Sequence, residues 1–287
     1  FSKQARLAWD DLDVTLLDTP GHVDFSAEME RVLQVLDYAV LVISGSDGVQ
    51  GHTRTLWRLL ARYQIPAFLF INKMDLAPGR EQEVLRDLKE SLGGNFVDFG
   101  ADGTESFYEE AAVSGEAELE EFLETGQVSK DAIRSRIASR DLFPCYFGSA
   151  LKMEGVQEFM DGMTGYIEKN QQQKTDPASG ESDTKGKSTG IFGAKAYKIS
   201  RDAAGNRLTH LKVTSGRLKV KDILKGDMRK NGHSDETEGA DHNWEEKVNQ
   251  IRIYSGEKYE AVAEAGPGSI CAVTGLTRTF PGQGLGA

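Results

Sequence analysis

The sequence is poor in cysteine, with only Cys145 and Cys271 in 287 residues. Two cysteines so far apart exclude the disulfide framework of a small secreted domain, and we expect two buried, reduced thiols in a cytoplasmic protein. Long apolar runs are also absent, since none approaches the roughly 18 residues of a membrane span. The sequence therefore predicts about two globular domains of roughly 100 to 200 residues each and no membrane segment.

Basic side chains are fewer than acidic ones. The chain has 34 Lys and Arg residues against 45 Asp and Glu residues, a formal net charge of -11, which argues against capture of nucleic acid by the whole surface. The segment 195–230 is an exception, with eleven basic and three acidic side chains. It either faces phosphate groups or forms solvated strands whose lysines protect sheet edges. The acidic segment 81–124 is interpreted as a solvated insertion.

Apolar runs alternate with helical periodicity in the first part of the chain, which predicts βαβ units and a mostly parallel sheet. A strand over 1–9 leads through a turn into a second strand that starts at Val14. Further strands are predicted at 38–44, 66–71 and 142–147, and helices at 25–36, 53–63, 78–92 and 156–169. Weaker helical stretches lie at 117–123 and 130–140.

The pattern changes after a polar stretch without periodicity at 171–190, which is predicted to be a linker. Short alternating strands follow, separated by glycine-rich turns, and predict a small β-barrel. We expect these strands at 192–200, 207–214, 217–224, 247–254, 257–263 and 269–276, with a polar hairpin tip at 231–243. The predicted domains are therefore 1–170, the linker 171–190, and 191–287.

Three polar clusters follow predicted strands, and the first is Asp18-Thr19-Pro20-Gly21-His22. The carboxylate of Asp18 can hold Mg²⁺ through a water molecule, and the N–H of Gly21 can contact a terminal phosphate. The imidazole of His22 can orient an attacking water. Taken alone, the same residues also fit a simple turn from a strand into a helix.

The second cluster is Asn72-Lys73-Met74-Asp75, and the third contains Ser149 and Ala150. The Asp75 carboxylate can accept hydrogen bonds from the ring N–H and the exocyclic amine of guanine, while the stem of Lys73 lies along the purine. Asn72 would tie neighbouring loops together, and the N–H groups of Ser149 and Ala150 would donate to the guanine carbonyl oxygen. Each motif alone also occurs by chance.

The order and spacing of the three clusters decide between these interpretations. Each closes an apolar strand of one α/β pattern, and ligands of such sheets bind at the carboxyl ends of the strands. We therefore predict one site at one sheet edge, of the kind found in GTP-binding domains.

The motifs resemble those of the translational GTPases, whose best-known member is elongation factor G. The resemblance rests on Asp18–His22 with Val23–Met29, on Ser46–Gln50 with Thr53 and Arg54, and on Asn72–Asp75. Residues 142–150 and the length of the preceding insertion most resemble the tetracycline-resistance ribosomal-protection proteins, and 190–287 resembles the β-barrel second domain of these factors.

This resemblance implies roles for the residues of the three clusters. His22 would be the catalytic histidine, positioned by ribosomal RNA, and Asp18 would hold Mg²⁺. GTP or GDP would be bound by Asp18, Thr19, Pro20, Gly21, His22, Asn72, Lys73, Met74, Asp75, Ser149 and Ala150. The second domain would contact the small ribosomal subunit.

One motif of the family is missing, because no G-x-x-x-x-G-K-[ST] sequence occurs in the chain. That loop supplies most of the affinity for a triphosphate. We therefore expect an N-terminally truncated, incomplete P-loop-type GTPase domain that is inactive as given, with pairing between chains as a compensation for the exposed sheet. The alternative is a nucleotide-independent binding or scaffolding module. Within the enzyme class, an elongation-factor or release-factor type remains open beside the resistance type.

Overall fold

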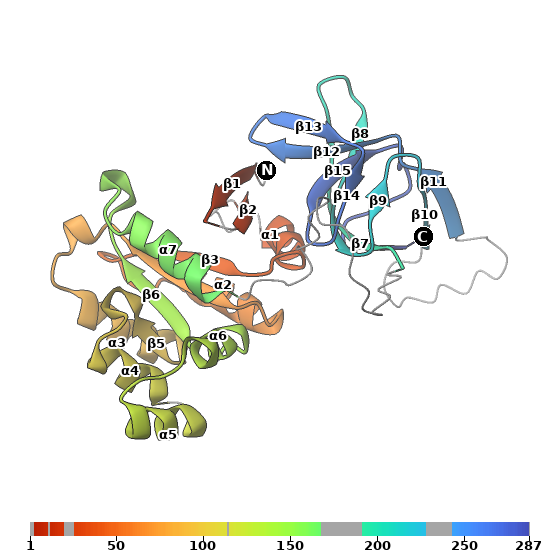
Figure 1. Cartoon of the computed structure of the whole chain (residues 1–287). Coiled ribbons are helices and arrows are strands. Elements are labelled where there is room, and N and C mark those ends of the chain that lie inside the picture. Colours follow the sequence, from red (N-terminus) through yellow and green to blue (C-terminus); the bar gives the residue numbers. More distant parts are fainter. Residues whose placement is uncertain are drawn as a thin grey trace, which may run out of the picture. The chain divides into compact units, whose positions relative to one another are not determined.

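The computed structural model describes residues 3–10, 12–19, 26–113, 115–167, 191–227 and 243–286. The chain divides into two compact units (Figure 1). The first, called the α/β unit, consists of Ala8–Leu12 and Leu36–Lys169, and the second, called the β-rich unit, of Phe1–Leu7, Asp13–Val35 and Asn170–Ala287.

This division differs from the predicted domains because it groups Asp13–Val35 with the second half of the chain. The predicted linker 171–190 lies outside the described residues. The predicted boundaries therefore stay a prediction.

The α/β unit contains a parallel sheet of four strands in the order β3-β4-β6-β5 (Figure 1). The strands are β3 (Ala39–Ser44), β4 (Ala67–Asn72), β5 (Phe96–Asp98) and β6 (Phe143–Phe147). The helices are α2 (Gly51–Arg62), α3 (Glu81–Leu92), α4 (Glu105–Ala112), α5 (Glu116–Thr125), α6 (Lys130–Ala138) and α7 (Val156–Tyr166), with 3₁₀ helices η2 (Met74–Leu76), η3 (Phe99–Ala101) and η4 (Ala150–Lys152). The predicted parallel α/β class is confirmed.

The central strand β4 explains why this sheet forms. Its sequence, AFLFIN, is apolar up to the last residue, and every side chain before Asn72 is buried, as expected for a strand covered on both faces. The ring centroid of Trp57 lies 4.6 Å from that of Phe143 and 5.3 Å from that of Phe96, so Trp57 packs against the strands β5 and β6. In the register, Ser44 lies opposite Asn72 and Ile71 opposite Phe147, so these three strands end at one edge.

The acidic insertion contributes more to the core than predicted. Helices α5 and α6 confirm the two weak helical stretches, whereas β5 and α4 were not predicted. Thr104 caps α4 by accepting a hydrogen bond from the N–H of Phe107 (3.2 Å), and the helix buries Phe107, Ala111 and Ala112. A helix of eight residues with four polar or acidic side chains gives too weak an apolar pattern to be recognised by periodicity.

The β-rich unit contains an antiparallel sheet in the order β11-β10-β16-β7-β8-β15-β12-β13, with β14 paired to β9. The strands are β7 (Gly193–Arg201), β8 (Arg207–Ser215), β9 (Leu218–Lys219), β10 (Ile223–Asp227), β11 (Asn243–Lys247), β12 (Gln250–Ser255), β13 (Lys258–Val262), β14 (Glu264–Ala265), β15 (Ile270–Thr274) and β16 (Gly284–Gly286). The predicted β-rich second domain is confirmed.

The structure corrects some strand limits in this unit. The single strand predicted at 217–224 is divided into β9 and β10, because Lys221 takes a left-handed φ of 79° in a turn between them. The strands β11, β14 and β16 were not predicted. Of the predicted hairpin tip, residues 231–242 lie outside the described residues, and Asn243 begins β11.

The strand that ends in Asp18 is not part of the parallel sheet, contrary to the prediction of one edge for all three clusters. It is β2 (Leu12–Asp18), and it forms a two-stranded sheet with β1 (Lys3–Trp9). The strand β2 pairs with β1, which precedes it across a short turn. Closing such a short loop costs little conformational entropy. The strand β3 is left at the edge of the parallel sheet with Val42 60% exposed, and pairing between chains there stays a prediction.

Both cysteines are buried free thiols, as predicted. Burial raises the pKa of the Cys271 thiol to about 12 and that of Cys145 well above its ordinary value. The sequence also predicts no membrane segment. In the described part of the chain, no helix is long and apolar enough to cross a membrane.

Candidate functional site

Two loops that follow neighbouring strands form the candidate site. One follows β4 and begins with Lys73, and the other follows β6 and begins with Gly148. The N–H of Gly148 donates to the carbonyl oxygen of Ile71 (2.9 Å), and the N–H of Met74 donates to that of Gly148 (3.0 Å). These bonds extend the pairing of the two strands into the loops, so the loops lie side by side.

The side chain of Asn72 joins the two loops. Its Oδ1 accepts from the N–H of Lys73 (2.8 Å) and from the N–H of Ala150 (2.9 Å), across 78 positions of sequence. Because both partners are donors, they also fix which end of the amide carries the oxygen. The structure thus places Asn72 in the linking position that the sequence predicted.

Residues 73–75 divide their side chains between the core and the solvent. Lys73 has a left-handed backbone (φ 64°, ψ 32°) and is exposed, whereas Met74 is buried. A Cβ atom on Gly45 would lie 2.5 Å from the Met74 sulfur, so Met74 anchors the loop beneath a glycine that leaves it room. Met74 is one of the residues predicted to bind the nucleotide, and its buried side chain supports the loop from the core.

Asp75 lies at the rim of the site with its side chain 14% exposed, and the Nζ atom of Lys152 lies 3.6 Å from its Oδ2. Lys152 is half exposed and comes from the other loop, so this ion pair is a second connection between the loops. Sequence reasoning missed Lys152 because spacing alone does not show which lysine reaches a carboxylate. Leu151 and Leu76, which are 93% and 68% exposed, add apolar surface on the same two loops.

Two glycines shape the second loop. The N–H groups of Ser149 and Glu154 exchange hydrogen bonds with each other's carbonyl oxygens (2.9 and 3.0 Å), which brings the ends of the loop together. A Cβ atom on Gly148 would lie 2.2 Å from the Glu154 oxygen, and one on Gly155 (φ 72°) 2.3 Å from the Phe147 oxygen. Neither position therefore accepts a side chain, and the two flanking glycines were the signal in the sequence for this tight turn.

The predicted donors to a nucleobase are already occupied. The N–H of Ser149 donates to Glu154 and that of Ala150 to Asn72, whereas the N–H of Leu151 has no acceptor within the described residues. Base contacts by Ser149 and Ala150 stay a prediction. The open N–H of Leu151 is the next donor along the loop.

The loop 46–50 lies after β3, at the same edge of the sheet. Asp87 of α3 holds it, because its Oδ2 accepts from the N–H of Val49 (2.9 Å) while its Oδ1 accepts from Ser91. Gly48 has a φ of 65° and has no room for a Cβ atom beside Asp87. The start of α2 is thereby fixed to α3.

The first cluster is divided by the limits of the described residues. Asp18 and Thr19 are described and belong to the β-rich unit, whereas Pro20, Gly21 and His22 lie outside the described residues. Among the residues that are described, no group of three or more His, Cys, Asp or Glu side chains could hold a metal ion. The assignments of Asp18 and His22 stay predictions.

The linking role of Asn72 gives a first testable prediction. Asn72→Ala removes the acceptor of two backbone N–H groups and is expected to lower the free energy of unfolding of the α/β unit by about 1–2 kcal/mol. Urea unfolding measures the loss. Asn72→Asp keeps an acceptor oxygen in place and is the matched control, so an equal loss in both variants would contradict the role of Oδ1.

Comparison with known proteins adds two findings. The sequence model of the elongation factor Tu GTP binding domain matches residues 1–169. A crystal structure of a protein from Thermus thermophilus is similar in fold, with a TM-score of 0.76 at 20% sequence identity. The match covers 100% of this chain and 46% of that protein, so the chain spans about half the length of its structural relative.

Proposed function

This chain belongs to the family of the elongation factor Tu GTP-binding domain, and we propose that it is part of a ribosome-dependent translational GTPase that binds and hydrolyses GTP. The observation that carries the proposal is the Asn72 side chain, which joins the two loops predicted to bind guanine. A bound base would lie against both loops, and their mutual anchoring keeps them positioned before the nucleotide arrives.

We also propose that the chain is one part of a longer protein. No G-x-x-x-x-G-K-[ST] loop occurs in its 287 residues, and the chain corresponds to 46% of its structural relative. Without a phosphate cradle we expect weak binding of GTP and no measurable turnover by the chain alone. The longer protein would act on cytoplasmic ribosomes, with the β-rich unit on the small subunit.

The position of Asp18 suits a magnesium ligand. Its carboxylate is exposed at the end of β2 and makes no ion pair or hydrogen bond within the described residues. Mg²⁺ keeps several of its waters and takes few carboxylates, so one free carboxylate at a strand end suits it. The ion would supply charge neutralisation for the phosphates of GTP.

The decisive experiment is a comparison of GTP hydrolysis by the longer protein with and without ribosomes. We expect turnover to rise strongly when ribosomes are added, because charge stabilisation and positioning of the water are completed there. A full-length protein without ribosome-stimulated turnover would refute the proposal and favour a nucleotide-independent binding module.

Within this class, we propose the ribosomal-protection type that confers tetracycline resistance. The support is the resemblance of residues 142–150 and of the length of the insertion before them. Translation in the presence of tetracycline, with and without the full-length protein, tests the assignment. Rescue is expected, and its absence alongside intact GTPase activity would indicate an elongation-factor or release-factor type.

Asp75 gives a prediction about base specificity. Asp75→Asn in the full-length protein is expected to raise the Kd for GDP about 10- to 100-fold, because the amide cannot accept from both the ring N–H and the amine of guanine. Xanthine carries a carbonyl oxygen in place of that amine, so the variant should regain affinity for xanthosine diphosphate. Titration with both nucleotides measures the change.

The control for this prediction is Glu83→Gln, which changes an exposed acid of α3 that pairs with Arg80. Its affinities for both nucleotides should stay at the level of the unmodified protein. Loss of affinity for both nucleotides by Asp75→Asn would indicate a general disturbance of the loop and would contradict base reading by this carboxylate.

A further inference from the structure

The carboxylate of Asp75 is largely buried, and its oxygens are open. The side chain is 14% exposed, and neither of its oxygens accepts a hydrogen bond from a group in the described part of the chain. A largely buried acceptor without a donor is unfavourable. A ligand that brings two donors to this carboxylate would therefore be stabilised by it.

Lys152 balances the charge of this carboxylate without using its oxygens. The distance of 3.6 Å between Lys152 Nζ and Asp75 Oδ2 is that of an ion pair, and it is too long for a hydrogen bond. The ammonium group therefore attracts the carboxylate and leaves the lone pairs of both oxygens available.

The backbone of both charged residues is anchored. The N–H of Lys152 donates to the carbonyl oxygen of Ser149 (3.1 Å), and the N–H of Ala150 donates to Asn72 Oδ1 (2.9 Å). Asn72 directly precedes the loop that carries Asp75. The same amide thus ties the start of one charged loop to the start of the other, which favours a constant separation of the two charges.

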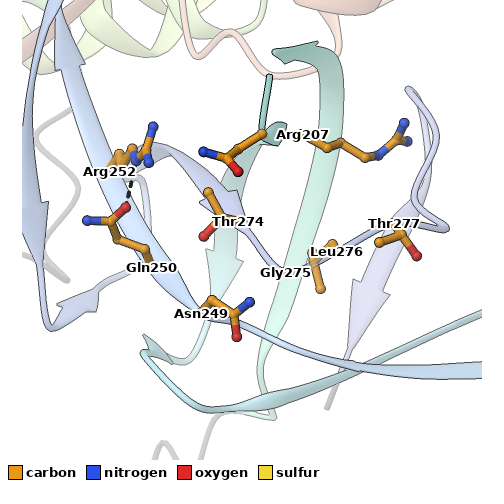
Figure 2. A pocket seen from close by; sticks show the side chains of 9 residues that line it. Arg207, Asn249, Gln250, Arg252, Thr274, Gly275, Leu276 and Thr277 are labelled. Atoms are coloured by element: carbon orange, nitrogen blue, oxygen red, sulfur yellow. Dashed lines mark hydrogen bonds between the residues drawn. The ribbon is translucent and has the colours of Figure 1, made fainter. Parts of the chain in front are cut away.

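The ion pair of Arg252 with Asp202 in the β-rich unit shows a different arrangement. Arg252 Nη1 donates to Asp202 Oδ2 (3.0 Å), and the same carboxylate accepts from the side chain of Asn206 (3.0 Å). Figure 2 shows the further bond of Arg252 to Gln250. The acceptors of that pair are already in use, whereas those of Asp75 are open.

We propose that Lys152 is a positioning residue for the guanine base. It holds the Asp75 carboxylate in place and balances its charge while two donors of the base occupy the oxygens. A base that covers this rim excludes water from the ion pair, and the attraction between the two charges becomes stronger as a result. The inference rests on the proposed function, because it assumes that Asp75 binds guanine, and it adds a residue that acts through Asp75.

The test measures the Kd for GDP of the full-length protein by equilibrium titration. Lys152→Met keeps the apolar stem and removes the charge, and it is expected to raise the Kd about 3- to 10-fold. Lys152→Arg restores a positive charge and should return the Kd to within about twofold of the original value. Lys152→Glu reverses the charge and should raise the Kd on the order of tenfold or more, because it places two carboxylates side by side.

A double-mutant cycle separates this role from a merely structural one. In the Asp75→Asn background, Lys152→Met should change the Kd for GDP by less than about twofold, because the charge that Lys152 balances is no longer there. A lysine that only stabilised its loop would weaken binding equally in both backgrounds.

The matched control is Lys89→Met. It removes the charge of another half-exposed lysine of the α/β unit, whose Nζ lies 3.9 Å from Glu110 Oε2. The Kd for GDP should stay within about twofold of that of the unmodified protein. Urea unfolding of each variant shows whether the α/β unit remains folded.

The outcomes distinguish this inference from the function on which it rests. If the unmodified full-length protein binds no GDP, both are overturned. If it binds GDP and Lys152→Met binds GDP as tightly, only the role of Lys152 is overturned. An equal effect of Lys152→Met with and without the Asp75 carboxylate also overturns that role and leaves the proposed function standing.

Discussion

In the full-length protein, His22→Ala is expected to lower ribosome-stimulated GTP turnover on the order of 10²- to 10⁴-fold, the usual contribution of a positioned acid or base. The Kd for GTP should stay within about threefold of its original value, because a group that acts only in the transition state does not contribute to ground-state binding. The reason is the predicted position of His22, directly after Gly21, which is the residue predicted to contact the terminal phosphate.

The affinity that remains in this variant has a structural source. The loops after β4 and β6 hold each other through Asn72 and through the pair of Asp75 with Lys152, and these contacts do not involve His22. Binding of the base and cleavage of the phosphate are therefore expected to be separable by mutation.

Single-turnover hydrolysis on ribosomes, together with equilibrium titration of GTP, measures both quantities. His52→Ala, which changes a histidine in the first turn of α2, is the matched control and should keep normal turnover. If His22→Ala weakens binding as much as it slows turnover, the histidine holds the nucleotide and does not orient the water.

The elements predicted from the sequence are those with a strong local pattern. The strand β4 and the helices α2 and α3 appear within a few residues of their predicted limits, because a continuous apolar run and a 3.6-residue period are readable along the chain. The linking role of Asn72 was also predicted, from its place at the start of the Asn72-Lys73-Met74-Asp75 motif.

Other features depend on contacts that a linear pattern does not contain. The strand β2 pairs with β1 and lies outside the parallel sheet. Its sequence is compatible with pairing to β1 or to a strand of the parallel sheet, so the sequence alone did not predict which partner it takes. The pairing of Lys152 with Asp75 joins two loops that lie far apart in the sequence.

The basic segment 195–230 shows a further limit of sequence reasoning. Its described lysines lie on strands and turns of the β-rich unit, and charge counted along the chain does not show which of them share a face. Its interpretation as a phosphate-facing surface stays a prediction.

A final prediction concerns the stability of the β-rich unit at mildly acidic pH, which depends on His210 in β8. Its Nε2 lies 2.7 Å from Ser200 Oγ, and its ring lies 6.1 Å from that of Tyr197 and 6.0 Å from that of Tyr254. Burial, with a smaller effect from the positive charge of Lys198, lowers the pKa of His210 from 6.5 to about 4.

The sign of the effect follows from proton uptake. Between pH 6.5 and about 4 the unfolded chain protonates this histidine and the folded unit does not, so the free energy of unfolding falls as the pH falls through this window. The full loss is on the order of 3 kcal/mol, from about 1.4 kcal/mol per pKa unit. Above pH 6.5 His210 is neutral in both the folded and the unfolded state, so it does not make the free energy of unfolding depend on pH.

Hydrogen exchange of the amides of β8 and β15, measured from about pH 4 to 7.5, isolates the β-rich unit from the rest of the chain. His210→Gln keeps a hydrogen-bonding group beside Ser200 without a titrating proton, and its stability should change little across the window. Asp202, with its pKa lowered from 3.8 to about 2, loses its contribution only below pH 3.8. If the unmodified protein and His210→Gln lose stability equally between pH 6.5 and about 4, other groups are responsible and the buried neutral histidine is not.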